Sequence, residues 1–210
     1  MIGRRAHSPI SLAGWPLFLA AALLAIVSFQ YSIIVTLFFC FVLFVLLYLF
    51  RDPWRSIPAD PLAVIAPVDG QILEIAKMNN PQTDHLDQRI TIALSKTGAY
   101  AVHSVTEGKI TTISRNAPDI TRRGKNMTAL SIVLRTDEDD DVVMVVHRGY
   151  LGHYPRCYHY TGERVGQGRR LSYIPFGRRV DVYVPDSARI DVKSGDRVTA
   201  GESILAHFVR

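Results

Sequence analysis

Two groups of residues in this chain could bind a metal ion. The acidic run Asp137–Asp141 offers clustered carboxylate oxygens, which divalent cations prefer. His147, His153 and His159 recur every six residues, a spacing that would put three zinc ligands on one face of a regular strand. Glycines and a proline between the histidines interrupt such a strand, and acidic runs in loops are usually only solvated. We therefore expect no metal site.

Basic side chains form a third group, concentrated in two stretches. One holds Arg122, Arg123 and Lys125, and the other runs from Arg164 to Arg179. Guanidinium and ammonium groups bind phosphate oxygens, so these stretches could face an anionic surface. Exposed loops that contact only water are an equally good interpretation. The formal net charge of +5 is too small to indicate nucleic-acid binding.

Apolar segments near the N-terminus come before all of these residues. Residues 12–50 contain no Asp, Glu, Lys or Arg, and Gln30 divides them into segments at roughly 14–29 and 32–50. A spanning helix needs about 20 apolar residues, with roughly 17 as the lower bound. We expect a transmembrane helical hairpin after a basic tail at 1–11. A cleaved signal peptide is the alternative, but no small-residue cleavage site precedes the second segment.

The charges that flank the apolar segments predict their orientation. Arg4 and Arg5 precede them, and Arg51 and Arg55 follow them. Positive charge favours the cytoplasmic side of a membrane. We therefore expect both ends of the hairpin, and the remaining domain at 51–210, on the cytoplasmic side of the inner membrane.

The pattern after residue 58 is typical of a mostly β domain. Short apolar or alternating runs are separated by turn residues, and no long helical repeat occurs. The predicted strands are Val64–Ala66, Gln71–Ala76, Arg89–Leu94, Lys109–Ile113, Thr128–Leu134, Val142–Val146, Val180–Val184 and Arg189–Val192. We expect a small sandwich or barrel. Its C-terminal part resembles biotinyl and lipoyl carrier domains but lacks their modifiable lysine, which makes this a structural likeness only.

Four motifs, in order along the chain, resemble one enzyme family. Residues 50–58 read FRDPWRSIP, residues 66–70 read APVDG, residues 176–185 read FGRRVDVYVP, and residues 192–202 read VKSGDRVTAGE. They are similar to the FFRDPxRxxP, SPADG, FGSRVDVYLP and VxxGDxVxAGE segments of short, bacterial-type phosphatidylserine decarboxylases. The resemblance covers about residues 10–207.

The resemblance implies a cofactor that the chain makes from its own backbone. In the family a serine hydroxyl attacks the carbonyl of the preceding glycine, the resulting ester eliminates, and the product hydrolyses to a pyruvoyl ketone. This ketone forms a Schiff base with the substrate amine and accepts the electrons released as carbon dioxide departs. A histidine and an aspartate assist the self-cleavage.

This chain departs from the family pattern at two of these positions. Gly177 keeps the glycine, but the serine position holds Arg178, whose guanidinium has no hydroxyl. Tyr100 occupies the histidine position in an ungapped match that ends at Gly108, although a shift of three residues would bring in His103. The aspartate remains as Asp69, which an ordinary tight turn would also explain.

Two other serines lie near Arg178 and could in principle supply the hydroxyl. Ser172 follows Leu171, which lacks the flexibility that glycine gives to an acyl shift. Ser187 lies downstream and also has no preceding glycine. Neither serine is a good replacement.

These observations predict a membrane protein related to phosphatidylserine decarboxylase but without catalytic activity. No pyruvoyl cofactor is expected, because none can form at Arg178. We expect the chain to bind phospholipid headgroups, with candidate contacts at Arg178, Arg179, Arg122, Arg123 and Lys125, or to form a hetero-oligomer with an active decarboxylase. The alternative is an active enzyme that makes phosphatidylethanolamine by an atypical route.

Overall fold

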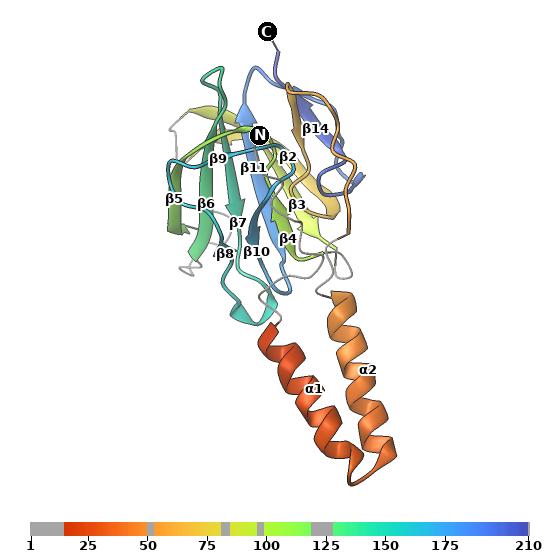
Figure 1. Ribbon diagram of the computed structural model, residues 1–210. Coiled ribbons are helices and arrows are strands. Elements are labelled where there is room, and N and C mark those ends of the chain that lie inside the picture. The colour runs from red at the N-terminus through yellow and green to blue at the C-terminus, as the bar shows by residue number, and fades with distance from the viewer. Residues whose placement is uncertain (1–14, 50–52, 81–84, 96–98, 119–127, 210) are drawn as a thin grey trace. The chain divides into compact units, whose positions relative to one another are not determined.

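Two structural units make up the chain, a helical unit within Met1–Trp54 and a β-rich unit within Arg55–Arg210 (Figure 1). The structure is a computed structural model. It describes residues 15–49, 53–80, 85–95, 99–118 and 128–209.

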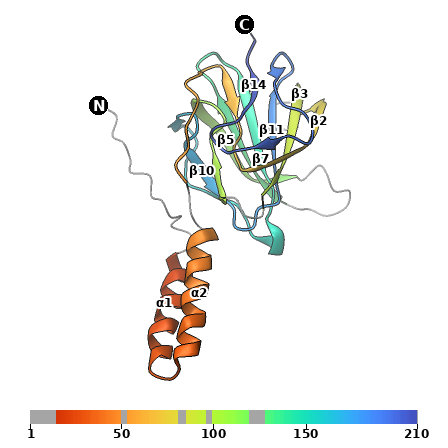
Figure 2. The same ribbon diagram turned by 90° about the vertical axis from the view of Figure 1, so that its right-hand side faces the viewer.

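The helical unit consists of α1 (Trp15–Phe29) and α2 (Ile33–Leu49), which lie side by side as a hairpin (Figure 2). The amide of Ser32 donates to the carbonyl of Ser28 and closes the turn between them. The helices have 15 and 17 residues, against the roughly 20 that a span needs. Among the described residues, no helix is both long enough and apolar enough to cross a membrane. The prediction of a transmembrane hairpin within 12–50 is therefore wrong.

A curved antiparallel sheet of eight strands forms most of the β-rich unit (Figure 1). In spatial order the strands are β13 (Arg197–Val198), β2 (Gly70–Asn79), β3 (Leu86–Leu94), β11 (Arg179–Pro185), β7 (Asp141–Val146), β6 (Thr128–Arg135), β5 (Gly108–Pro118) and β9 (Arg164–Val165). The β-rich character agrees with the prediction. The sheet is a half-barrel, however, and not the small sandwich or barrel that we expected.

Two sheets of three strands complete the unit. The first has the order β1 (Ala63–Ile65), β14 (Ile204–His207) and β12 (Arg189–Ile190), and the second β4 (Ala101–His103), β10 (Arg170–Tyr173) and β8 (Arg156–Cys157). A 3-10 turn occupies Tyr150–Gly152. The strand β13 joins the large sheet while β12 and β14 pair elsewhere, so the C-terminal part is not a separate carrier-like unit.

Strict alternation of side chains explains how the large sheet forms its core. Ile90 and Ile92 on β3 and Val180, Val182 and Val184 on β11 point to one face and are fully buried. The intervening residues point to the opposite face, which is also buried but carries polar groups. All eight predicted strands overlap observed ones. Several strands of two to four residues, such as β4 and β10, were missed because they are too short to show a period.

Candidate functional site

The turn between β10 and β11 holds the glycine and arginine of the third motif. Phe176 adopts the left-handed backbone region at φ 51°, which is uncommon for a residue with a side chain. The amide of Tyr150 donates to the carbonyl of Phe176 at 2.8 Å and holds the turn in this form. An added Cβ at Gly149 would lie 2.5 Å from the carbonyl oxygen of Pro175. The segment that contains Gly149 therefore packs directly against the turn.

Tyr100 lies beside this turn. Its ring centroid is 5.4 Å from that of Phe176 and 6.4 Å from that of Tyr173, and its carbonyl accepts the amide of Ile174 at 2.9 Å. The antiparallel pairing of β4 with β10 produces this position, because it aligns Ala101 with Tyr173. The structure thus brings Tyr100 to the turn.

His103, the alternative to Tyr100, lies elsewhere in the same small sheet. It is three residues farther along β4, where it pairs with Arg170 and is buried. Tyr100, which the ungapped match assigns to the histidine position, is therefore the residue that lies against Phe176.

Burial raises the pKa of the Tyr100 phenol above its ordinary value of 10.0. A phenol with a raised pKa keeps its proton at neutral pH. Tyr100 can therefore donate a hydrogen bond, but it cannot accept a proton as a histidine with an ordinary pKa near 6.5 does.

Asp69 sits at the start of β2 and joins several distant segments through its carboxylate. Oδ1 accepts the amide of Ala200 at 2.9 Å, and Oδ2 accepts Nη2 of Arg55 at 2.7 Å and the amide of Ala99 at 3.4 Å. The Arg55 and Asp69 side chains are only 13% and 19% exposed, so this ion pair is largely shielded from water. Because Ala99 directly precedes Tyr100, the same contacts bring Asp69 close to Tyr100.

Two consecutive amides at the end of β3 connect Asp69 to the turn. Leu94 donates to the carbonyl of Arg178 at 3.0 Å, and Ser95 donates to the carbonyl of Asp69 at 2.8 Å. An added Cβ at Gly177 would lie 2.4 Å from Cδ2 of Leu94. Asp69, Tyr100, Gly177 and Arg178 are therefore brought into one site, although they come from three separate parts of the sequence.

The two arginines of the third motif have different surroundings. The guanidinium carbon of Arg178 lies 5.1 Å from the ring centroid of Tyr150, a cation–π contact, and the side chain remains partly exposed. Arg179 instead points to the second face of the sheet, where Nη2 is 3.0 Å from Nε2 of His147. Nε of Arg179 is 3.3 Å from Oδ1 of Asp181. The remaining predicted phosphate contacts, Arg122, Arg123 and Lys125, lie outside the described residues.

A buried cluster of Arg179, Asp181 and His147 was not predicted from the sequence. Nε2 of His147 lies 2.7 Å from Oδ2 of Asp181, and both side chains are less than one tenth exposed. The sequence carried a sign of this cluster, because Asp181 is an acidic residue within the apolar run Val180–Val184. The cluster anchors the first residue of β11 and thereby the end of the turn.

The predicted absence of a metal site was based on the histidines and the acidic run. In the described part of the chain, no group of three or more His, Cys, Asp or Glu side chains is arranged to hold a metal ion. His147 faces Asp181, and His159 lies 2.7 Å from Glu163. Within the acidic run, Asp137 pairs with Arg164 and Asp141 with Arg135.

Ser172 is fully buried in β10. It lies between Val102 and Cys157 on the neighbouring strands, next to an irregularity in the pairing with β4. The carbonyl of Leu171, which an acyl shift would attack, already accepts the amide of Tyr158 at 3.0 Å.

The ion pair between Arg55 and Asp69 should stabilise the fold measurably. We expect Arg55→Gln and Asp69→Asn to show a coupling of about 1–2 kcal/mol in the free energy of unfolding, because the pair is largely buried and hydrogen bonded. Urea unfolding of the full chain in detergent, followed by circular dichroism, measures it for both single variants and the double variant.

The exposed pair of Lys77 and Asp186 is the matched control, with side chains 59% and 41% exposed. Its coupling, measured with Lys77→Gln and Asp186→Asn, should be at most about 0.5 kcal/mol. Equal couplings for the two pairs would show that Asp69 has no special structural role.

Comparisons with known proteins agree with the motifs. The phosphatidylserine decarboxylase family model matches residues 42–206. The chain is 33% identical to a phosphatidylserine decarboxylase proenzyme of Cupriavidus pinatubonensis and 29% identical to one of Nitrosomonas europaea, with 96% of each chain covered in both cases. Glucose permease IIA from Mycoplasma capricolum matches 69% of this chain and 94% of its own at 14% identity and a TM-score of 0.45, which is too low to carry an argument. This chain belongs to the phosphatidylserine decarboxylase family.

Proposed function

We propose that this chain is a member of the family that makes no pyruvoyl group and binds phospholipid headgroups without decarboxylating them. The observation that carries the proposal is the side chain at the self-cleavage position. The residue after Gly177 is Arg178, and its guanidinium lies over the ring of Tyr150.

The residues at this position do not fit a self-derived pyruvoyl group. Its formation begins with a β-hydroxyl or thiol that attacks the carbonyl of Gly177, and Arg178 carries neither. A guanidinium also stays protonated at any physiological pH, so it has no lone pair for the attack.

The groups around the turn support the same conclusion. Tyr100 stands where the motif resemblance places a histidine, and its raised pKa keeps the phenol protonated at neutral pH, so it has no vacant site for the serine proton. Asp69 remains, but its two carboxylate oxygens bind Arg55 and the amide of Ala200. These contacts stabilise the fold whether or not the chain catalyses a reaction.

Restoring the two missing groups should restore self-cleavage. We expect Arg178→Ser combined with Tyr100→His to cleave between residues 177 and 178, because Asp69 and the tight turn at Gly177 are already in position. Arg178→Ser alone should stay uncleaved, since Tyr100 cannot take the serine proton. Intact mass spectrometry of the purified variants measures both outcomes.

Adding Asp69→Asn to the double variant is the control, and it should abolish cleavage again. A double variant that remains intact while its circular dichroism matches that of the parent chain would contradict the claim that Arg178 and Tyr100 are what prevents cleavage.

The headgroup contact centres on Arg178 in this proposal. Its guanidinium is partly exposed and stacks on Tyr150, which leaves N–H groups at its edge for a phosphate oxygen. Arg179 is a weaker candidate, because it faces His147 and Asp181. Arg122, Arg123 and Lys125 stay predictions.

Arg178→Ala should weaken binding of soluble short-chain phosphatidylethanolamine by about fivefold, since one cation near a phosphate contributes about 1 kcal/mol. Calorimetric titration of the full chain in detergent measures the affinity. Arg197→Ala is the matched control, because Arg197 is an exposed arginine at the edge strand β13. Equal losses in the two variants would indicate nonspecific attraction, and no loss in either would overturn the headgroup contact.

The proposal extends to the inner membrane and to a second family member. Leu19, Ile26, Phe29, Ile34 and Phe44 of the helical unit are strongly exposed apolar side chains, which suit a phospholipid surface. The β-rich unit would then work on the cytoplasmic side, beside an active decarboxylase in a hetero-oligomer. Recovery of the chain in the soluble cell fraction, with no second family member bound, would contradict both parts.

A further inference from the structure

Residues 55–60, which we call the strap, lead into β1 and contact the rest of the β-rich unit at several positions. Arg55 pairs with Asp69, and the amide of Ser56 donates to Oε1 of Glu202 at 3.0 Å. Ile57 packs so closely on Gly168 that an added Cβ there would lie 2.6 Å from its Cδ1. The remaining end of the strap, at Asp60, is held by a histidine.

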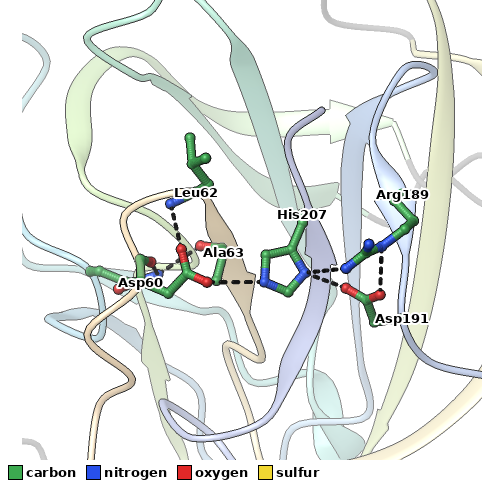
Figure 3. Close-up of polar contacts among 7 residues, drawn as sticks. Asp60, Leu62, Ala63, Arg189, Asp191 and His207 are labelled. Atoms are coloured by element: carbon green, nitrogen blue, oxygen red, sulfur yellow. Dashed lines mark hydrogen bonds and ion pairs between the residues drawn. The ribbon is translucent and has the colours of Figure 1, made fainter. Parts of the chain in front are cut away.

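Figure 3 shows the imidazole of His207 between two carboxylates from different segments. Nε2 lies 3.1 Å from Oδ2 of Asp60, and Nδ1 contacts Oδ2 of Asp191. A neutral imidazole has only one N–H to donate, whereas the protonated ring has two. Both contacts are hydrogen bonds at the same time only when the ring is protonated.

Three charged groups face His207 in the described structure. Asp60 comes from the strap, Asp191 follows β12, and Arg189 lies on β12 itself. Nε of Arg189 donates to Oδ1 of Asp191 at 3.0 Å, which holds that carboxylate in place. On the opposite neighbour, β1, the partner of His207 is Ala63, which carries no charge. Two negative charges against one positive favour the protonated ring.

We propose that His207 is a proton-operated latch that fastens the Asp60 end of the strap to the sheet formed by β1, β14 and β12. The latch is separate from the site at Arg178, and it does not depend on whether the chain binds lipid. When the ring loses its proton, one of the two carboxylates loses its hydrogen bond and the like charges of Asp60 and Asp191 are no longer compensated.

The pKa directions define where the latch should work. The hydrogen bond with Asp191 raises the pKa of His207 above its ordinary value of 6.5 by more than burial lowers it, and Asp60 adds to the rise. Burial alone would raise the pKa of Asp191, but hydrogen bonds from His207 and Arg189 lower it below its ordinary value of 3.8.

The sign of the pH dependence follows from these two shifts. The contribution of His207 is fully present below pH 6.5 and is lost as the pH rises through its raised pKa. The contribution of Asp191 is present above pH 3.8 and is lost on acidification. The latch is therefore closed in mildly acidic solution and opens as the solution becomes alkaline.

Hydrogen–deuterium exchange of the full chain tests the latch at the amides next to Asp60. The amide of Leu62 donates to Oδ1 of Asp60, and the amide of Ala63 donates to its carbonyl. After correction for intrinsic exchange, protection of the peptide that contains them should fall about tenfold between about pH 5.5 and about pH 8.5. In Asp60→Asn it should be low at both pH values.

Asp186→Asn is the matched control, because the side chains of Asp186 and Asp60 are both 41% exposed and each faces one cation. It should behave like the parent chain.

Exchange at the imidazole carbon of His207, read by mass spectrometry, should give a pKa above 6.5 in the parent and a lower one in Asp60→Asn. Protection that is independent of pH, or an unchanged His207 pKa in Asp60→Asn, would overturn the proposal.

Discussion

The carboxylate of Asp69 is the interaction on which the arrangement of the candidate site depends. It binds Arg55 from the strap, the amide of Ala200 near the C-terminus and the amide of Ala99 beside Tyr100. A largely buried carboxylate is stable only when it is paired and hydrogen bonded, so these contacts favour the meeting of the three segments. The end of β3 connects Asp69 to the turn at Arg178 through two backbone hydrogen bonds. The amide of Ser95 donates to the carbonyl of Asp69, and the amide of Leu94 donates to the carbonyl of Arg178.

The same framework shapes the turn through contacts that do not involve the side chain of residue 178. The turn is shaped by backbone contacts, by Gly149 and by Gly177, and none of these needs a hydroxyl at residue 178. Arg178 projects from this turn onto Tyr150 and does not disturb the hydrogen bonds beneath it. The backbone of the turn therefore does not depend on a hydroxyl group at residue 178.

The elements that could be predicted from the sequence are those that a short stretch of residues determines. Alternating apolar residues identified β3, β6, β7 and β11, and the motifs identified Asp69, Gly177 and Arg178 as neighbours in function. Sequence reasoning missed what depends on pairing over long distances, such as the contact between Tyr100 and the turn through β4 and β10, and the cluster of Asp181, His147 and Arg179. It also misjudged the helices, because an uninterrupted apolar composition says little about how much of it becomes helical. In the part of the chain that the structure describes, the turn at residues 30–32 separates helices of 15 and 17 residues, and neither is long and apolar enough to cross a membrane.

The most direct test of the central claim is the intact mass of the purified, unaltered chain, measured beside carbon dioxide release from phosphatidylserine. We predict one uncleaved species near 23.5 kDa and no release of carbon dioxide. Two fragments, the smaller beginning with a ketone in place of an amine, would contradict it and would show that another residue supplies the hydroxyl.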